Sequence, residues 1–215
     1  MFNYVFIDFD KTIFDCFQFE QDMWKVAEER KISKKDYIET YRQAIHSRTK
    51  DVYDYTFEGH IQLLELRGYH NLDGMLDAWD TLLKNNYLFE GVEALLGFLQ
   101  KNSKHLILLT AGNKSFQMKK ISSAPIQIFF EEIVVLDGHK EIYLSGLNTH
   151  FGGSLFINDS MRENNILKQT FPDLTIVVRF ESRDEHNYTE EQMKEFGALY
   201  FVSLKDMLEH FKQIT

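Results

Sequence analysis

Two acids and a threonine follow one apolar stretch near the start of the chain. The segment YVFIDFDKTIF, residues 4–14, places Asp8 and Asp10 one residue apart and Thr12 two residues further on. Two carboxylates about 4 Å apart repel each other by roughly 4 kcal/mol at an effective dielectric near 20. The pair therefore indicates a site that holds a cation, and oxygen ligands of this kind favour Mg²⁺.

Six short apolar segments predict the strands that would carry such residues. Their apolar residues are consecutive rather than alternating, which is typical of strands covered by helices on both faces of a parallel sheet. Helical patterns separate them, so we predict an α/β fold with a Rossmann-like doubly wound parallel sheet. The predicted strands are 4–8, 105–110, 132–137, 154–159, 175–180 and 198–202. The predicted helices of this part are about 91–102, 114–121, 161–171 and 204–212.

The region after the first strand lacks this alternation. Residues 17–88 contain four helical patterns in succession, each with apolar residues at three- and four-residue spacing. Ser33 and Asp36 resemble a helix-start capping pair, and Gly68 is placed to end the third helix. We therefore predict an all-helical cap at 17–88, inserted into an α/β core made of 1–16 and 89–215.

Three later strands also end in residues that could do chemistry. In an open parallel sheet, ligands bind beyond the carboxyl ends of the strands. The second strand ends in Thr110, Lys140 follows the third, and Asp159 ends the fourth, with Glu163 shortly after it. Acids, a hydroxyl and a lysine at one rim suit Mg²⁺-assisted phosphoryl transfer. One carboxylate could attack phosphorus while a neighbouring acid protonates the leaving oxygen.

These residues resemble the four motifs of the haloacid dehalogenase (HAD) superfamily of hydrolases. The matching segments occur in the family's order, and the helical insertion resembles the family's cap. They are DFDKT at 8–12, LLT at 108–110, Lys140 after a strand, and IND at 157–159. The resemblance extends over residues 1 to about 170 and implies a Mg²⁺-dependent phosphatase that forms an aspartyl-phosphate.

The resemblance also implies a role for each matching residue. Asp8 would be the nucleophile and Asp10 the general acid and base, while Thr110 and Lys140 would hold the phosphoryl group. Asp10 favours phosphoryl chemistry over dehalogenation, because a halide leaves without needing a proton. The implied Mg²⁺ ligands are Asp8, the backbone carbonyl of Asp10, Asp159 and, in an assisting position, Glu163.

Other lysines could bind the phosphate in place of Lys140. We favour Lys140 because it directly follows the third strand and its turn. The alternatives lie in the helix after the second strand and are interpreted as surface charges, the usual position of lysine. They are Lys114, Lys119 and Lys120.

A second register of the first motif is also open. DKT at 10–12 resembles the start of the phosphorylation motif of P-type ion pumps, in which Asp10 would be the nucleophile. Ile13 and Phe14 replace the glycine and threonine that continue the pump motif.

Composition limits the partners and the location. The chain has 215 residues and a formal net charge of -9, which disfavours a role in nucleic-acid binding. Cys16 is the only cysteine, the N-terminus lacks the pattern of a secretory signal, and no window of 18 apolar residues occurs. We expect a cytoplasmic protein without a membrane segment.

The predicted function is hydrolysis of a small phosphorylated metabolite with Mg²⁺ as cofactor. One alternative is a phosphomutase of the same superfamily, which would return the phosphoryl group to its substrate. Another is a binding or regulatory module that retains the fold but has weak activity.

Overall fold

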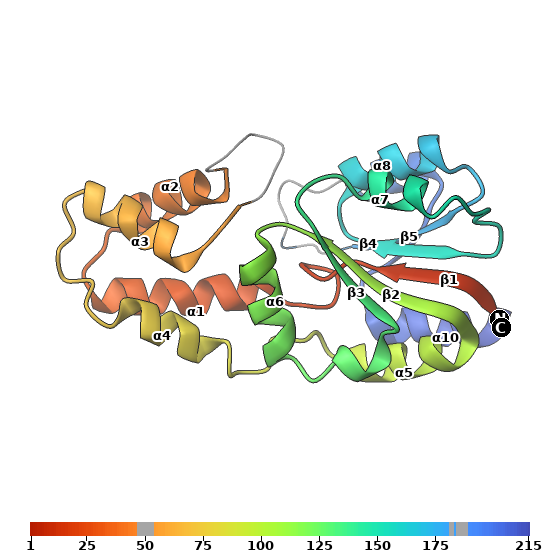
Figure 1. Cartoon of the computed structure of the whole chain (residues 1–215), viewed down its shortest axis with the longest axis horizontal. Coiled ribbons are helices and arrows are strands. Elements are labelled where there is room, and N and C mark those ends of the chain that lie inside the picture. The colour runs from red at the N-terminus through yellow and green to blue at the C-terminus, as the bar shows by residue number, and fades with distance from the viewer. Residues whose placement is uncertain (47–53, 181–182, 184–188) are drawn as a thin grey trace.

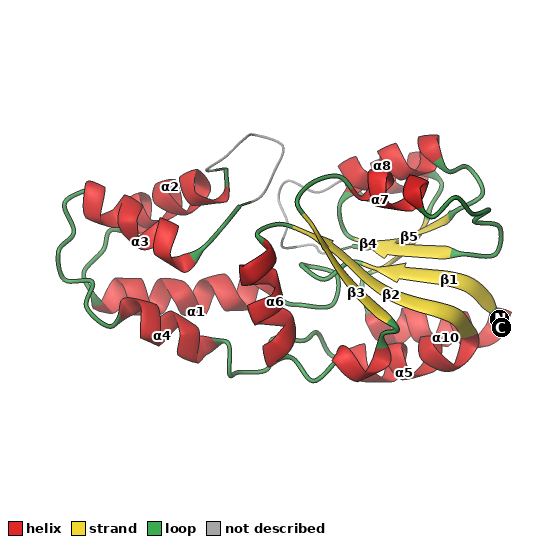
Figure 2. Cartoon of the chain, in the orientation of Figure 1, coloured by secondary structure: helices red, strands yellow, loops and turns green. Residues whose placement is uncertain are grey.

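A six-stranded parallel sheet lies at the centre of the α/β part of the chain (Figure 1, Figure 2). The computed structural model describes residues 1–46, 54–180, 183 and 189–215. The strand order is β3-β2-β1-β4-β5-β6, with β1 in the interior of the sheet. The strands are β1 (Phe2–Ile7), β2 (Ser103–Ala111), β3 (Glu132–Leu136), β4 (Leu155–Asn158), β5 (Thr175–Arg179) and β6 (Leu199–Phe201). The predicted doubly wound parallel sheet is confirmed, and each predicted strand lies within two residues of its observed bounds.

Helices cover both faces of this sheet. In Figure 1, α7 (Lys140–Gly146) and α8 (Met161–Thr170) lie over one face, while α5 (Val92–Asn102) and α10 (Leu204–Ile214) lie over the other. Alternate residues of a strand point to opposite faces. In β1, Ile7 packs in the cluster of the α5 side and Phe6 in that of the α8 side. Both faces are buried, which explains why the strands read as continuous apolar runs.

The remaining helices of this part include two that the sequence patterns did not predict. The short helices α7 and α9 (Glu190–Phe196) have seven residues each, too few for a repeating apolar pattern to stand out. A 3₁₀ turn, η1 (Gln127–Phe129), precedes β3, and α6 (Lys114–Ser123) follows β2. None of the helices in the described part of the chain has the length and apolar character needed to cross a membrane.

Four helices lie beyond the carboxyl ends of the strands (Figure 1). They are α1 (Cys16–Glu29), α2 (Lys34–Ile45), α3 (Phe57–Leu66) and α4 (Met75–Leu82). The Ser33 hydroxyl accepts a hydrogen bond from the Asp36 N–H at 3.1 Å, so the predicted start of α2 is confirmed. Gly68 has a φ of 91°, a left-handed conformation that favours glycine and follows the end of α3. We refer to these four helices as the helical cap.

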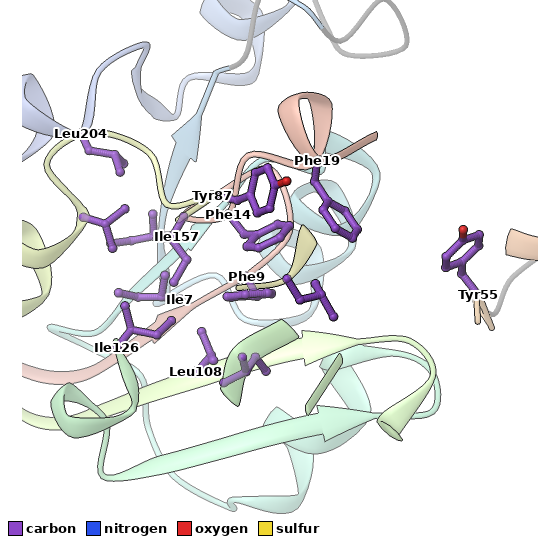
Figure 3. Packing of buried hydrophobic residues seen from close by; sticks show 14 of the residues in the cluster. Ile7, Phe9, Phe14, Phe19, Tyr55, Tyr87, Leu108, Ile126, Ile157 and Leu204 are labelled. Atoms are coloured by element: carbon purple, nitrogen blue, oxygen red, sulfur yellow. The ribbon is translucent and has the colours of Figure 1, made fainter. Parts of the chain in front are cut away.

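Two connecting segments join the helical cap to the sheet and run side by side. The Asp15 N–H donates to the Tyr87 carbonyl at 2.7 Å. The ring of Phe14 lies 5.0 Å from that of Phe9 and 5.7 Å from that of Tyr87. Figure 3 shows these rings next to Ile7 and Ile157 of the sheet. The apolar core therefore continues from the sheet through both connections into the helical cap.

Helix α6 provides a further contact between the sheet and the helical cap. Phe116 of α6 packs against Phe57 and Tyr55, with ring centroids 4.9 and 5.1 Å apart. The side chain of Asn113, which begins α6, donates to Asp54 at 2.8 Å. The position of α6 is thus determined by contacts with both parts of the molecule.

A buried histidine lies in the middle of the helical cap. His60 is fully inaccessible to solvent, and its two ring nitrogens lie 3.0 Å from the hydroxyls of Thr40 and Tyr55. Burial lowers the pKa of His60 from 6.5 to about 4, so the folded protein holds this ring neutral.

We predict that acidification destabilises the protein through His60. The unfolded chain binds a proton at His60 near pH 6.5 and the folded chain only near pH 4. The unfolded state therefore holds more protons at His60 in this window, and the contribution of His60 to stability falls by about 3 kcal/mol as the pH decreases from 6.5 to 4. Urea unfolding at several pH values measures the slope of the unfolding free energy against pH. His60→Gln should reduce the slope and the matched exposed variant His70→Gln should not; equal slopes in both would contradict the prediction.

Candidate active site

The chain turns sharply after β1 and returns Thr12 to the end of the strand. Ile13 and Phe14 donate their N–H groups to the Phe9 carbonyl at 3.0 and 2.9 Å, which closes the turn. Lys11 adopts a φ of 58° within it, a left-handed conformation that a non-glycine residue adopts at some cost. Asp8 and Thr12 consequently face the same rim of the sheet, and the Thr12 hydroxyl lies 3.5 Å from the Asp8 carboxylate.

The sheet register brings three of the predicted motifs to this rim. Ile7 of β1 pairs with Leu108 of β2 and with Ile157 of β4. Asp8, Thr110 and Asp159 follow these three paired residues within two positions, on three adjacent strands. Thr110 is 1% exposed. The three side chains thus leave the sheet at nearly the same level.

Lys140 is the buried cation of the rim. It is the first residue of α7, and its ammonium donates to Asp8 at 2.6 Å and to Glu163 at 2.7 Å. Burial alone would lower the pKa of Lys140, but the charges of Asp8 and Glu163 raise it above its ordinary value. The ammonium therefore stays charged. Lys140 thus lies between the two carboxylates of Asp8 and Glu163.

Thr12 connects Asp8 to Asp159. The Thr12 hydroxyl lies 3.4 Å from the Asp159 carboxylate, and it accepts the Asp159 backbone N–H at 3.1 Å. Thr12 is completely buried. One hydroxyl therefore ties the end of β4 to the turn after β1 and brings two carboxylates to the same place.

The buried acids carry more negative charge than Lys140 offsets. Burial, together with neighbouring carboxylates, raises the pKa of Asp8 and that of Asp159. Burial would also raise the pKa of Glu163, but Lys140 and a hydrogen bond from Asn158 at 3.0 Å lower it. A divalent cation would relieve the repulsion between Asp8 and Asp159. Their oxygen atoms fit a hard ion such as Mg²⁺.

Glu163 shares the Lys140 ammonium with Asp8 and has a further hydrogen bond of its own. Its carboxylate is engaged by Lys140 and by Asn158, whose amide also donates to Asn164 at 3.1 Å. In the described ranges, no three side chains of His, Cys, Asp or Glu form a metal-binding group. A Mg²⁺ site needs only one or two carboxylates, and its other ligands are water and substrate oxygens. Asp8 and Asp159 can supply the two carboxylates.

Asp10 lies in a different environment, formed by α6. Its Oδ1 accepts from the Lys120 ammonium at 2.5 Å and from the Cys16 thiol at 3.3 Å, and its Oδ2 accepts from Gln117 at 2.7 Å. Burial would raise the pKa of Asp10, but Lys120 and the hydrogen bonds lower it. These contacts therefore favour the ionised form of Asp10.

The interpretation of Lys120 as a surface charge is wrong. Lys120 is 5% exposed and its ammonium pairs with Asp10, while Lys119 pairs with Asp80 at the surface and Lys114 is exposed. Helix α6 buries Gln117, Lys120 and Ile121, which are spaced as one helical face. The sequence contained this spacing, but a lysine and a glutamine on a buried face are rare enough to be taken as exposed.

Comparison with known proteins gives matches among solved structures alone. No family model and no curated protein matches the chain. A protein of Thermotoga maritima described as a β-phosphoglucomutase matches with a TM-score of 0.66 and 18% identity, over 99% of this chain and 100% of that one. A HAD-hydrolase of Bacillus subtilis, bound to magnesium, matches with a TM-score of 0.61 and 15% identity, over 97% of each chain.

An L-2-haloacid dehalogenase of Xanthobacter autotrophicus also matches, with a TM-score of 0.63 and 13% identity over the whole of both chains. Three proteins of this kind, matched over almost their full lengths, decide the fold. The chain has a haloacid dehalogenase-like fold. The identities are too low to carry activity or substrate from these proteins to this one.

Within this haloacid dehalogenase-like fold, the four sequence motifs lie at one rim. Asp8, Lys140 and Asp159 are joined through direct contacts and through Thr12. A small cavity of about 50 Å³ adjoins Lys140 and Glu163, between the loops that follow β2, β3 and β4. The cavity and the Lys140 ammonium therefore lie together at this rim.

We predict that Thr12→Val destabilises the protein by about 1–3 kcal/mol, because the buried Asp159 N–H loses its acceptor. The free energy of unfolding in urea measures this loss. Thr12→Ser keeps the hydroxyl and should lose much less. A Thr12→Val variant as stable as the wild type would show that this hydroxyl does not hold the rim together.

Proposed function

We propose that the chain is a Mg²⁺-dependent phosphatase of the HAD type that hydrolyses a small phosphorylated metabolite through an aspartyl-phosphate. The observation that carries the proposal is the buried Asp8 carboxylate, paired with Lys140 at 2.6 Å and tied to Asp159 through Thr12. A carboxylate beside a fixed ammonium can approach a phosphoryl group whose charge that ammonium offsets.

In the first step, an Asp8 oxygen attacks phosphorus and the bond from phosphorus to the ester oxygen breaks. Asp10, which must take up a proton before this step, gives that proton to the leaving oxygen, so the product departs as an alcohol. Lys140 remains beside Asp8 and neutralises part of the charge on the transferring group. Thr110 leaves β2 at nearly the same level, where its hydroxyl would donate to a phosphoryl oxygen.

In the second step, Asp10 is ionised and takes a proton from water as the water oxygen attacks phosphorus. The bond between phosphorus and the Asp8 oxygen breaks, which releases phosphate and regenerates the Asp8 carboxylate. The contacts from Lys120 and Gln117 favour the ionised form of Asp10 that this step requires.

The proposed Mg²⁺ ligands are Asp8, Asp159 and the backbone carbonyl of Asp10, with Glu163 assisting from its position beside Lys140. The ion would supply positive charge to the phosphoryl oxygens. Support comes from the burial of Asp8 and Asp159 and from repulsion by neighbouring carboxylates, which raise the pKa of both side chains and which a cation would offset. Magnesium is also bound in the related fold from Bacillus subtilis.

Asp10 distinguishes phosphoryl transfer from dehalogenation. One of the proteins with this fold is a dehalogenase, and halide departure needs no proton donor. In this chain a second carboxylate follows the nucleophile by two residues and is held by three donors. A group kept in position to exchange protons supports ester hydrolysis.

The helical cap formed by α1 to α4, which the sequence predicts as an insertion at 17–88, would select the substrate. Its helices lie beyond the carboxyl ends of the strands (Figure 1), above the rim that carries Asp8. The rim recognises only a phosphoryl group, so contacts with the rest of the molecule must come from the cap. Closure of the cap would also exclude bulk water.

Asp8→Asn should abolish phosphate release, because the neutral amide cannot attack phosphorus. The measurement is release of inorganic phosphate from a panel of sugar, nucleotide and amino-acid phosphates with Mg²⁺ present. Free phosphate distinguishes hydrolysis from a phosphomutase, which would give an isomeric ester. Circular dichroism shows whether the variant is folded, and appreciable turnover by folded Asp8→Asn would refute the nucleophile assignment.

Mg²⁺ should stabilise the wild-type protein against unfolding without any substrate. Binding to the folded state alone adds about 2.7 kcal/mol at a Mg²⁺ concentration 100 times Kd. The melting temperature, measured with and without Mg²⁺ after EDTA treatment, reports this gain. Asp159→Asn should lose most of the Mg²⁺-dependent shift, and an equal shift in both proteins would exclude Asp159 as a ligand.

A further inference from the structure

Helix α6 holds the side chain of Asp10 through two residues, to which the proposed mechanism gives an electrostatic role alone. Gln117 and Lys120 lie three positions apart on its buried face and bind different oxygens of the same carboxylate. Gln117 also donates to the Ala111 carbonyl at 3.1 Å, which fixes its amide relative to the end of β2. Residues of one helix therefore hold both oxygens of the Asp10 carboxylate.

The ammonium of Lys120 is itself fixed by aromatic rings. It lies 5.5 Å from the ring centre of Phe9, 5.3 Å from that of Phe14 and 5.3 Å from that of Phe116. Phe9 and Phe14 flank Asp10 in the turn after β1, and Phe116 belongs to α6. Three rings at this distance attract a cation and restrict where its N–H groups can point.

Stability alone does not explain the ion pair between Lys120 and Asp10. Taking two charges out of water costs several kcal/mol per ion, and apolar residues of similar volume often stabilise a protein as well or better. Lys120 is 5% exposed, yet the Asp10 side chain keeps 30% of its surface exposed. The donors thus approach the carboxylate from the protein side and leave its other side accessible.

The hydrogen-bond pattern distinguishes the two oxygens of Asp10. Oδ1 accepts from Lys120 and from Cys16, whose thiol stays protonated because burial and the charge of Asp10 raise its pKa. Among the described residues, Oδ2 accepts only from Gln117. A carboxylate has about four lone-pair sites, two on each oxygen. Oδ2 therefore retains a site for a proton.

We propose that Lys120 and Gln117 are positioning residues that aim Oδ2 of Asp10 at the leaving oxygen of the substrate and then at water. This inference rests on the proposed function, because it assigns a geometric role within the same reaction. It predicts that loss of either residue impairs proton transfer more than attack by Asp8, even though the loss would raise the pKa of Asp10 and favour its protonated form.

The test compares two esters of nearly the same shape, p-nitrophenyl phosphate and phenyl phosphate. The nitrophenolate leaves readily without a proton, whereas the phenolate depends more strongly on a general acid. The ratio of kcat/KM for the two substrates reports the first chemical step and is insensitive to a uniform loss of active protein. Asp10→Asn defines the ratio when proton donation is absent.

Lys120→Met and Gln117→Met should each lower kcat/KM for phenyl phosphate by about 10- to 100-fold, because general acid catalysis contributes roughly 10²–10⁴-fold. The same variants should lower kcat/KM for p-nitrophenyl phosphate by less than about threefold. Lys120→Arg, which keeps the charge, should recover part of the loss. Lys119→Met, altered at the neighbouring surface residue, should retain the wild-type ratio.

Equal losses for both esters in folded Lys120→Met and Gln117→Met would overturn the positioning role while leaving the proposed function intact. Gln117→Met introduces no unpaired charge, so it keeps the test decisive if Lys120→Met does not fold. A wild-type protein that releases no phosphate from either ester or from the metabolite panel would instead overturn the proposed function and this inference with it.

Discussion

The buried ion pair between Lys140 and Asp8 is the interaction on which the arrangement of the rim depends. Both side chains are less than a tenth exposed, and removing one partner of such a pair typically costs about 3–5 kcal/mol. Lys140 follows β3, whereas Asp8 follows β1, and β2 lies between these strands. Helix α7 must therefore begin where its first residue reaches across the end of β2. The order of the strands and the start of α7 together make this contact possible.

The two acids of the first motif lie in opposite electrostatic environments. Burial raises the pKa of Asp8 despite Lys140, while Lys120, Gln117 and Cys16 lower that of Asp10 despite its burial. Two carboxylates with different surroundings can perform different tasks in one reaction. The turn after β1 separates them, because it directs Asp8 toward the sheet rim and Asp10 toward α6.

Much of the fold could be predicted because its signals are local. Strands buried on both faces must be apolar at every position, so each appears as a short continuous run. Helices α7 and α9 were missed because seven residues make only two turns. The motif residues could be placed at one rim, since parallel strands end on the same side of a sheet. Which of them touch could not be predicted, because Asp8 and Lys140 are 132 residues apart.

The sequence by itself determined the order of the apolar strands, the polar residues that follow them and the position of the helical insertion. These features depend on residue type and spacing, which local physical chemistry can interpret. Only the tertiary structure decided that Lys120 lies inside and binds Asp10, 110 residues away in the chain. A lysine's exposure depends on which face of α6 packs against the turn after β1. That packing is determined by contacts with Phe9, Phe14 and the helical cap, all distant in sequence from α6.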